Sequence, residues 1–254
     1  MREVKEGAEI DAIRLAIDVT RNAFFKMLTV VKPNAYEHEV EASINGFFTQ
    51  NGAKMAFDTI AAACENACIL HYIDNSKILN SGELILIDFG ASINGYNADV
   101  TRTLPVNGKF TARQKEVYSS VLHIQKEVTK EITPGKSITD LVRLAGKLCE
   151  QELVKLNLLL QEDIARQDPE KPLYKKYFMH GIGHFLGIDV HDVGKKDDVL
   201  KPGMVITCEP GIYIPEEAIG IRLENDILLT ENGCENLTIA IPIEIDEIEH
   251  ILNK

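Results

Sequence analysis

The first fifty residues carry apolar side chains at the three- and four-residue spacing of amphipathic helices. In residues 8–31 the apolar positions are Ile10, Ile13, Ile17, Phe24 and Met27. This spacing predicts a helix over residues 8–31 that ends before Pro33, because proline cannot continue a helix. A second helix is predicted over residues 36–50, and Asn51-Gly52 gives it a stop signal.

Strand-like apolar runs follow over residues 54–100. Two further helices are predicted after them, because Thr111 with Gln114 and Ser137 with Asp140 have the spacing of N-terminal capping boxes. The chain therefore begins with a helix pair, a group of strands and a second helix pair.

The remaining part of the chain repeats the change from helices to strands. Residues 161–173 are polar and predict a loop or frayed helix, strand-like runs return over residues 177–230, and a short acidic helix is predicted over 244–252. No Gly/Ser-rich or Pro-rich linker interrupts the sequence, so residues 1–254 are predicted to form one domain. The repeated order indicates an α+β fold built from two similar halves.

The composition narrows the class of partner. The 254 residues are 45% hydrophobic and 26% charged, which is ordinary for a soluble globular protein, and their net charge is −12. Binding to nucleic acid needs clustered Lys and Arg, and the densest basic stretch, residues 171–176, is short. No run reaches the ~18 apolar residues of a membrane span. Five cysteines without a CxxC pair, and no secretory signal, predict a cytoplasmic protein with reduced thiols.

Four acidic residues adjoin apolar, strand-like runs: Asp88 ends LILID, Asp99 lies in YNADV, Glu209 ends VITCE and Glu224 ends IRLE. Taken singly, such residues are more often solvated surface charges or helix caps. Four carboxylates in one pocket would repel one another, which raises their pKa values unless a cation neutralises them. Two divalent ions would balance the four negative charges, so the set predicts a dinuclear metal site.

The geometry around the first two acids follows from one turn. If Asn94-Gly95 forms a two-residue hairpin turn, Asp88 faces Thr101 and Asp99 faces Gly90. The two carboxylates would then be diagonal neighbours with backbones roughly 7–8 Å apart, close enough to share an ion pair. Thr101 would lie on the same face and could donate a hydrogen bond that orients a ligand carboxylate.

Four of the seven histidines, His71, His180, His184 and His191, lie in apolar or glycine-rich surroundings. Each of these is by itself more often a hydrogen-bonded core residue than a ligand. His180 and His184 are four positions apart and could both reach one site, but across glycines this spacing leaves their roles open. The other three histidines, His38, His123 and His250, lie in polar helical stretches and are predicted on the surface.

The motifs LILIDFGASINGYNADVTRT, FMHGIGHFLGIDVHDVG, VITCEPGIY and GIRLENDILLT resemble those of the metallopeptidases with the pita-bread fold, which include methionine aminopeptidase, Xaa-Pro aminopeptidase and prolidase. The resemblance extends over nearly the whole chain. It implies a pita-bread fold whose two pseudo-symmetric halves surround a curved antiparallel sheet. The family's metal ligands fall here on Asp88, Asp99, His184, Glu209 and Glu224.

The resemblance also implies a catalytic role for several residues. Glu209 would take a proton from the attacking water and pass it to the leaving nitrogen. His191 would stabilise the oxyanion and His71 would position the substrate, while His180 and Arg222 would complete the substrate-binding site. Two ions ~3.5–4 Å apart would activate the water. The oxygen-rich ligand set favours manganese, with cobalt or zinc as substitutes.

The motifs HGIGHFLGIDVHDVG and NADVTRTLPVNG resemble the proline-specific branch of this family. The loop between Glu209 and Glu224 is short, whereas typical prolidases carry an insertion there. We therefore expect an Xaa-Pro aminopeptidase that acts on peptides with proline at the second position, with prolidase as the alternative. A creatinase-like hydrolase or a non-catalytic binding protein of this fold would lack some ligands, so the complete set disfavours both.

The proline-specific members usually carry a separate N-terminal domain that helps to build the dimer. The present sequence starts at the first predicted helix of the catalytic domain, so residues 1–254 are predicted to be the catalytic domain without that partner domain. A monomer and a homodimer both remain open.

Overall fold

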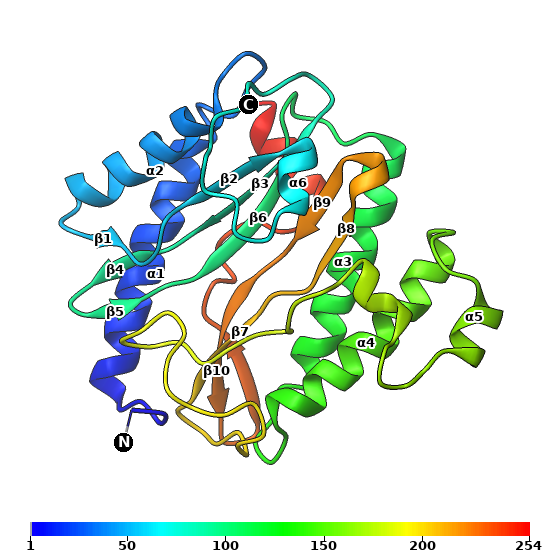
Figure 1. Ribbon diagram of the computed structural model, residues 1–254. Helices are drawn as coiled ribbons and strands as arrows, with labels where there is room; N and C mark the ends of the chain where they lie inside the picture. Colours follow the sequence, from blue (N-terminus) through cyan, green and yellow to red (C-terminus); the bar gives the residue numbers. More distant parts are fainter. Residues whose placement is uncertain (1) are drawn as a thin grey trace.

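The computed structural model describes residues 2–254 as helices and antiparallel strands (Figure 1). The helices are α1 (Gly7–Met27), α2 (Glu37–Gln50), α3 (Ala112–Lys130), α4 (Ile138–Lys155), α5 (Gln161–Arg166) and α6 (Ile245–Leu252). The strands are β1 (Lys54–Met55), β2 (Ile60–Ala63), β3 (Leu84–Phe89), β4 (Ala91–Ile93), β5 (Tyr96–Asn97), β6 (Val100–Pro105), β7 (Val205–Cys208), β8 (Gly211–Ile214), β9 (Ile219–Arg222), β10 (Asn225–Thr230) and β11 (Gly233–Asn236). Short 3-10 helices are η1 (Cys64–Cys68), η2 (Leu173–Lys176) and η3 (Pro215–Glu217).

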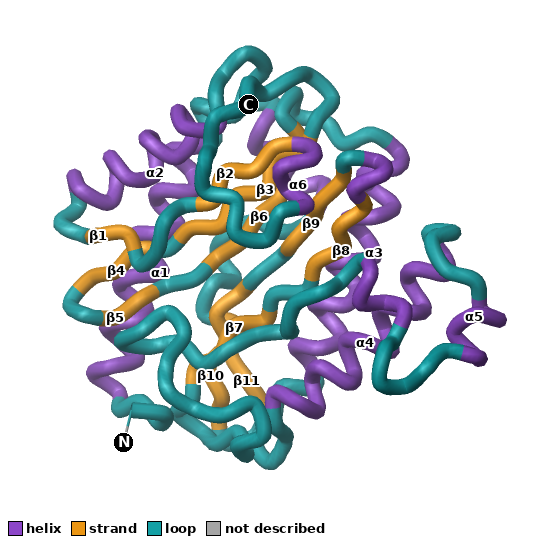
Figure 2. Tube along the Cα trace, viewed as in Figure 1, coloured by secondary structure: helices purple, strands orange, loops and turns teal. Residues whose placement is uncertain are grey.

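Each half of the chain places a helix pair against antiparallel strands (Figures 1 and 2). In the first half, α1 and α2 pack together and contact the sheets ordered β2-β3-β6 and β1-β4-β5. In the second half, α3 packs on α4 and contacts strands of β11-β10-β7 and β8-β9. Contacts of β6 with β9 and β10 join the halves. This arrangement confirms the predicted order of two similar halves.

The hairpin that fixes the first pair of acids has the predicted register. Ile93 pairs with Tyr96, which leaves Asn94-Gly95 as a two-residue turn. Both turn residues have positive φ (54° and 82°), as a type I′ turn requires. The same register continues between β3 and β6, where Asp88 lies opposite Thr101.

The helix starts agree with the sequence, but one strand region does not. Thr111 and Ser137 each accept a hydrogen bond from the backbone N–H three residues on, as capping boxes do. Strands were predicted throughout residues 177–230, yet residues 177–204 follow an irregular path, apart from isolated bridges at Phe185 and Met204. That prediction was wrong because this glycine-rich stretch is a loop that buries its own apolar side chains in the core, as a strand would. None of the helices within residues 2–254 has the length and apolar content needed to cross a bilayer.

A fully buried arginine on β6, Arg102, ties the strands of one half to a segment near the C-terminus. Its guanidinium donates hydrogen bonds of 2.6–3.0 Å to the carbonyl oxygens of Thr101, Glu224, Ile241 and Pro242 and to Oδ1 of Asn225. Burial lowers the pKa of Arg102 to about 10, so the group remains cationic near neutrality. Arg102 thereby holds the backbone of a predicted metal ligand, Glu224, in place.

We expect Arg102→Met to lower the free energy of unfolding by about 3 kcal/mol or more, because each buried oxygen left without a donor costs roughly 1–3 kcal/mol. Urea unfolding measures the change. The control is Arg143→Met on α4, where an exposed arginine forms an ion pair with Asp140 at 3.3 Å, and we expect a change below about 0.5 kcal/mol. Equal effects of the two substitutions would contradict the role of Arg102.

Candidate metal centre

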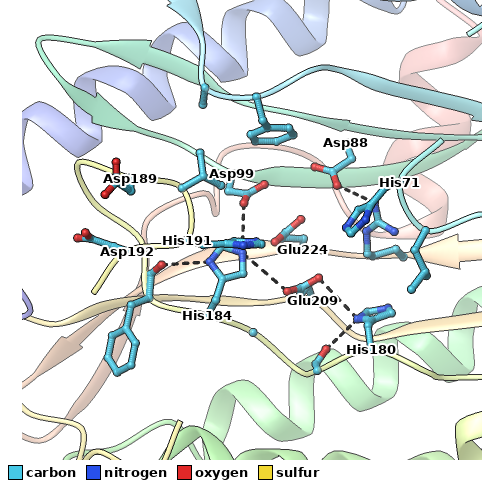
Figure 3. Close-up of a pocket in the computed structure, with 18 of the residues that line it drawn as sticks. His71, Asp88, Asp99, His180, His184, Asp189, His191, Asp192, Glu209 and Glu224 are labelled. Carbon is cyan, nitrogen blue, oxygen red and sulfur yellow. Dashed lines mark hydrogen bonds and ion pairs between the residues drawn. The ribbon is translucent and has the colours of Figure 1, made fainter. Parts of the chain in front are cut away.

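A cavity of about 830 Å³ lies where the ends of strands from both halves meet. Nine predicted site residues line it: Asp88, Asp99, His184, Glu209, Glu224, His71, His180, His191 and Arg222. Figure 3 shows the four carboxylates directed toward a shared space, with the histidines around them. Thr101, the tenth predicted residue, is buried behind this wall. The three histidines predicted on the surface, at positions 38, 123 and 250, are exposed.

Asp99, His184 and Glu224 form the tightest group in this cavity. Each offers one ligand atom, and these atoms lie within 4.8 Å of one another. His184 Nε2 is 3.4 Å from Asp99 Oδ2, while its Nδ1 faces the carbonyl oxygen of Phe185 at 3.1 Å. A proton on Nδ1 satisfies that carbonyl, which leaves the Nε2 lone pair directed at the carboxylates. This is the tautomer that a metal-binding histidine needs.

Asp88 and Glu209 flank this group. Asp88 Oδ2 accepts a hydrogen bond of 2.6 Å from Arg222, and Asp88 Oδ1 is a buried oxygen without a hydrogen-bond partner among residues 2–254. Glu209 Oε1 lies 3.9 Å from His184 Nε2, and its Oε2 lies 3.7 Å from His180 Nδ1. A buried carboxylate oxygen without a donor and an oxygen-rich set of four acids fit a hard divalent cation.

Hydrogen bonds behind the cavity wall orient the candidate ligands. Thr101 Oγ1 donates to Glu224 Oε2 at 2.6 Å and accepts from Arg222 Nε at 3.1 Å. Arg222 Nη1 also donates to the Tyr213 hydroxyl at 3.0 Å, and that hydroxyl lies 2.8 Å from His180 Nε2. Tyr213 is fully buried, and its hydroxyl connects Arg222 with His180.

Asp226, which is fully buried on β10, was not among the site residues predicted from the sequence. Its Oδ2 accepts the backbone N–H of Asp99 at 3.1 Å. The Asp99 N–H has no partner in the β3–β6 ladder, because that ladder ends at the pair Phe89–Val100. Beyond this pair the two chains approach so closely that a Cβ on Gly90 would lie 1.8 Å from the carbonyl oxygen of Ala98. One signal was present in the sequence: Asp226 is two positions after Glu224, and alternate strand residues share a face.

The pKa values of the acids reflect their crowding. Burial, followed by repulsion from Glu224, raises the pKa of both Asp99 and Glu209 well above the ordinary carboxyl range. Burial and then Asp88 raise the pKa of Glu224 to about 7. Asp99 and Glu209 therefore hold protons near neutrality, and Glu224 loses its proton close to neutral pH, unless a cation replaces these protons.

The histidines are electrostatically different from the acids. Burial and the adjacent Arg222 lower the pKa of His180 to about 3, so its imidazole is neutral. Burial, followed by repulsion from His184, lowers the pKa of His191, whose ring packs edge-on against that of His184 with centroids 4.2 Å apart. His71 is exposed in the cavity wall. His180 and His191 can therefore donate or accept hydrogen bonds without adding positive charge to the site.

The chain is similar to metallopeptidases in both sequence and structure. The model of metallopeptidase family M24 matches residues 11–231. An Xaa-Pro aminopeptidase of Haemophilus influenzae is 41% identical over 100% of this chain and 61% of its own length. The Xaa-Pro aminopeptidase of Escherichia coli is 39% identical over 99% of this chain and 60% of its own length. The chain thus spans about three fifths of these relatives.

Two solved structures agree closely with the fold. The zinc-substituted aminopeptidase P of E. coli in complex with product superposes with a TM-score of 0.93 at 38% identity, covering 100% of this chain and 60% of that one. Proline aminopeptidase P II of Yersinia pestis gives the same TM-score and identity, covering 100% of this chain and 61% of that one. This likeness confirms the predicted α+β pita-bread fold.

We expect binding of Mn²⁺ to release protons, and its affinity to increase as the pH rises from about 6 to about 8, because metal binding needs deprotonated ligands. The sign follows from the raised pKa values: below about 7 Glu224 keeps its proton, and the ion must displace it. Calorimetric titration in two buffers of different ionisation enthalpy counts the protons released. Release should be smaller at pH about 8.5 than at about 6.5; equal release at both would contradict the raised pKa of Glu224.

Proposed function

This chain belongs to metallopeptidase family M24, and on that basis we propose that it is the catalytic domain of a metal-dependent Xaa-Pro aminopeptidase. The observation that carries the proposal is the convergence of four acids and one histidine from both halves of the fold on one cavity. The names of the two bacterial relatives support the substrate class. The activity is proposed for this chain because it spans about three fifths of those proteins.

Asp88, Asp99, His184, Glu209 and Glu224 would hold two divalent ions, which supply Lewis-acid charge for activating water and polarising the peptide carbonyl. We propose manganese, because four carboxylates and one imidazole make an oxygen-rich set, with cobalt or zinc as substitutes. The hydrogen bonds of Thr101 and Arg222 orient Glu224 and Asp88 for this role.

Glu209 is proposed to move the proton. Its carboxylate takes a proton from the attacking water and delivers it to the nitrogen of the leaving proline residue, because general acid–base groups work best with a pKa near the working pH. Burial raises the pKa of Glu209 in that direction. His180 Nδ1 lies 2.8 Å from the Gly181 carbonyl oxygen and 3.7 Å from Glu209 Oε2, and its Nε2 lies 2.8 Å from the Tyr213 hydroxyl. The imidazole is therefore fixed in place beside this carboxylate.

The remaining histidines are proposed to bind the substrate. His191 lies beside His184, where a neutral imidazole could donate to the peptide oxygen as negative charge develops on it. His71 reaches the cavity from the opposite side, from the chain between β2 and β3 (Figure 3), where it would position the peptide. Arg222, which also lines the cavity, donates a hydrogen bond to Asp88 and would complete the binding site from there.

Three further points remain predictions. The short β8–β9 connection, η3, supports an aminopeptidase over a prolidase, the alternative function. The intact donor set disfavours a non-catalytic binding protein and a creatinase-like enzyme. A single domain over residues 1–254 and a cytoplasmic location are predictions from the sequence and its family resemblance alone, and a monomer and a homodimer are both compatible with them.

In a manganese-supplemented assay we expect an Xaa-Pro-Pro tripeptide to lose its first residue faster than an Xaa-Pro dipeptide is cleaved. An Xaa-Ala-Pro tripeptide is the matched control and should be cleaved poorly, because it lacks proline at the second position. Chromatography of the released amino acid measures each rate. Faster cleavage of the dipeptide would make the chain a prolidase, and no cleavage by metal-loaded protein would contradict the proposed activity.

Glu209→Gln should lower kcat by ~10²–10⁴-fold, the usual contribution of a proton-transfer group. Metal content and urea unfolding are measured alongside kcat, since Glu209 also faces the proposed metals. The control is Glu216→Gln in the neighbouring β8–β9 connection, where the carboxylate is exposed and contacts Lys176 at 3.3 Å. We expect that control to keep kcat within about twofold. Wild-type kcat in Glu209→Gln would remove Glu209 from the proton-transfer step.

A further inference from the structure

Glu37 is a buried carboxylate that the proposed reaction does not use. It is the first residue of α2 and is fully buried, on the side of the helix that faces β2. The nearby Lys77 does not neutralise it: the Lys77 ammonium lies 2.7 Å from Glu65 and 3.3 Å from Glu83. A buried charge needs other partners.

Neutral donors from a single segment, residues 63–77, surround the Glu37 carboxylate. Oε1 accepts hydrogen bonds from the Ala63 backbone N–H at 2.7 Å and from Asn66 Nδ2 at 3.1 Å. Oε2 accepts from the Tyr72 hydroxyl and from the Lys77 backbone N–H, both at 2.8 Å. The Glu37 backbone N–H in turn donates to the Lys77 carbonyl oxygen at 2.9 Å. One carboxylate thus joins both ends of the segment and two points between them.

A neighbouring set of contacts holds the same segment against α2. Buried Asn75, which has a positive φ of 43°, accepts the Ala61 N–H at 2.9 Å and donates to Glu41 at 2.9 Å. His38 Nδ1 lies 3.3 Å from the Asn75 carbonyl oxygen. The first turns of α2 therefore act as a clamp on residues 63–77. This segment belongs to the connection from β2 to β3, which crosses in front of the sheet in Figure 1.

The clamped segment carries His71 into the cavity. His71 precedes Tyr72, whose hydroxyl donates to Glu37, and it is exposed at the cavity wall together with Ile73. An exposed ring at the end of a loop takes its position from the backbone that carries it. We propose that Glu37 is a positioning residue, whose carboxylate fixes residues 63–77 so that His71 faces the peptide substrate; this inference rests on the proposed peptidase function.

The sharpest variant is Glu37→Gln, which keeps the size of the side chain. A glutamine has one accepting oxygen, so its NH₂ group must face the N–H of either Ala63 or Lys77. We expect kcat/KM on the Xaa-Pro-Pro peptide to fall by ~10–10²-fold, the cost of a small misplacement in an active site, with metal content unchanged. The matched control is Glu39→Gln in the same helical turn, where an exposed carboxylate accepts the Tyr36 N–H, and we expect less than a threefold change.

A double-mutant cycle separates positioning from a general loss of stability. If Glu37 acts through His71, the combined Glu37→Gln/His71→Ala variant is no slower than His71→Ala alone. Independent losses that multiply in the combined variant would overturn the proposal. Urea unfolding confirms that each variant is folded under the assay conditions.

Two measurements do not depend on activity and so separate this inference from the proposed function. Hydrogen exchange at the Ala63 and Lys77 amides should be faster in Glu37→Gln than in wild type or Glu39→Gln, and the NMR signal of the His71 ring should shift only in Glu37→Gln. Unchanged exchange and an unchanged His71 signal would overturn the inference. If the wild-type chain cleaves no Xaa-Pro peptide while these two changes occur, the peptidase function fails and the clamp on His71 stands.

Discussion

Repulsion among acids within one cavity is the constraint on which the rest of this structure depends. Asp88, Asp99, Glu209 and Glu224 line one cavity, Asp226 lies buried behind Asp99, and Arg222 is the single arginine beside the four acids in the cavity wall. Such a set is unfavourable in water-poor surroundings unless protons or cations compensate it. The fold must therefore hold these side chains together against their repulsion before any ion binds, because a site that relaxed apart would lose its geometry.

The fold meets this requirement with fixed hydrogen bonds on both sides of the acids. Thr101 and Arg222 hold the side chains of Glu224 and Asp88, whereas Asp226 and Arg102 hold the backbones of Asp99 and Glu224. Strands supply the acids in pairs, since a strand end gives a side chain a defined direction and the neighbouring strand gives it a register. The two halves are needed together because Asp99 and Glu224, which lie within one ligand group, come from different halves.

The parts that could be predicted from the sequence are those that depend on short-range rules. Once Asn94-Gly95 is identified as a two-residue turn, the pairing partner of each residue from Ile93 back to Asp88 follows from its distance from the turn. Capping boxes mark the starts of α3 and α4. Family resemblance, together with the acids beside apolar runs, identified the side chains that line the cavity. Asp226 and Glu37 were missed because their hydrogen-bond partners lie 127 and up to 40 positions away. The spacing of Asp226 from Glu224 indicates a shared strand face, but it does not predict the contact with Asp99. The irregular path of residues 177–204 was missed because a buried loop and a buried strand have similar apolar content.

His71 and His191, which we propose to contact the substrate, both lie outside the strands, and each precedes a buried residue. His71 depends on the loop bound by Glu37, and His191 precedes Asp192, a buried carboxylate that Lys5 approaches to 3.3 Å. The partners differ in consequence. Neutral donors of residues 63–77 bind both carboxylate oxygens of Glu37, and these hydrogen bonds are directional, so the segment has one favoured position. Lys5 and Arg2 both donate to the Asp192 carboxylate, and the Asp192 backbone N–H donates to the Phe185 carbonyl oxygen at 2.8 Å. Close packing at Gly187, where a Cβ would lie 2.2 Å from Asp192, leaves this carboxylate little room to move. The placement of His191 therefore relies on cations, close packing and a backbone hydrogen bond at Asp192, and that of His71 on neutral donors gathered around one carboxylate.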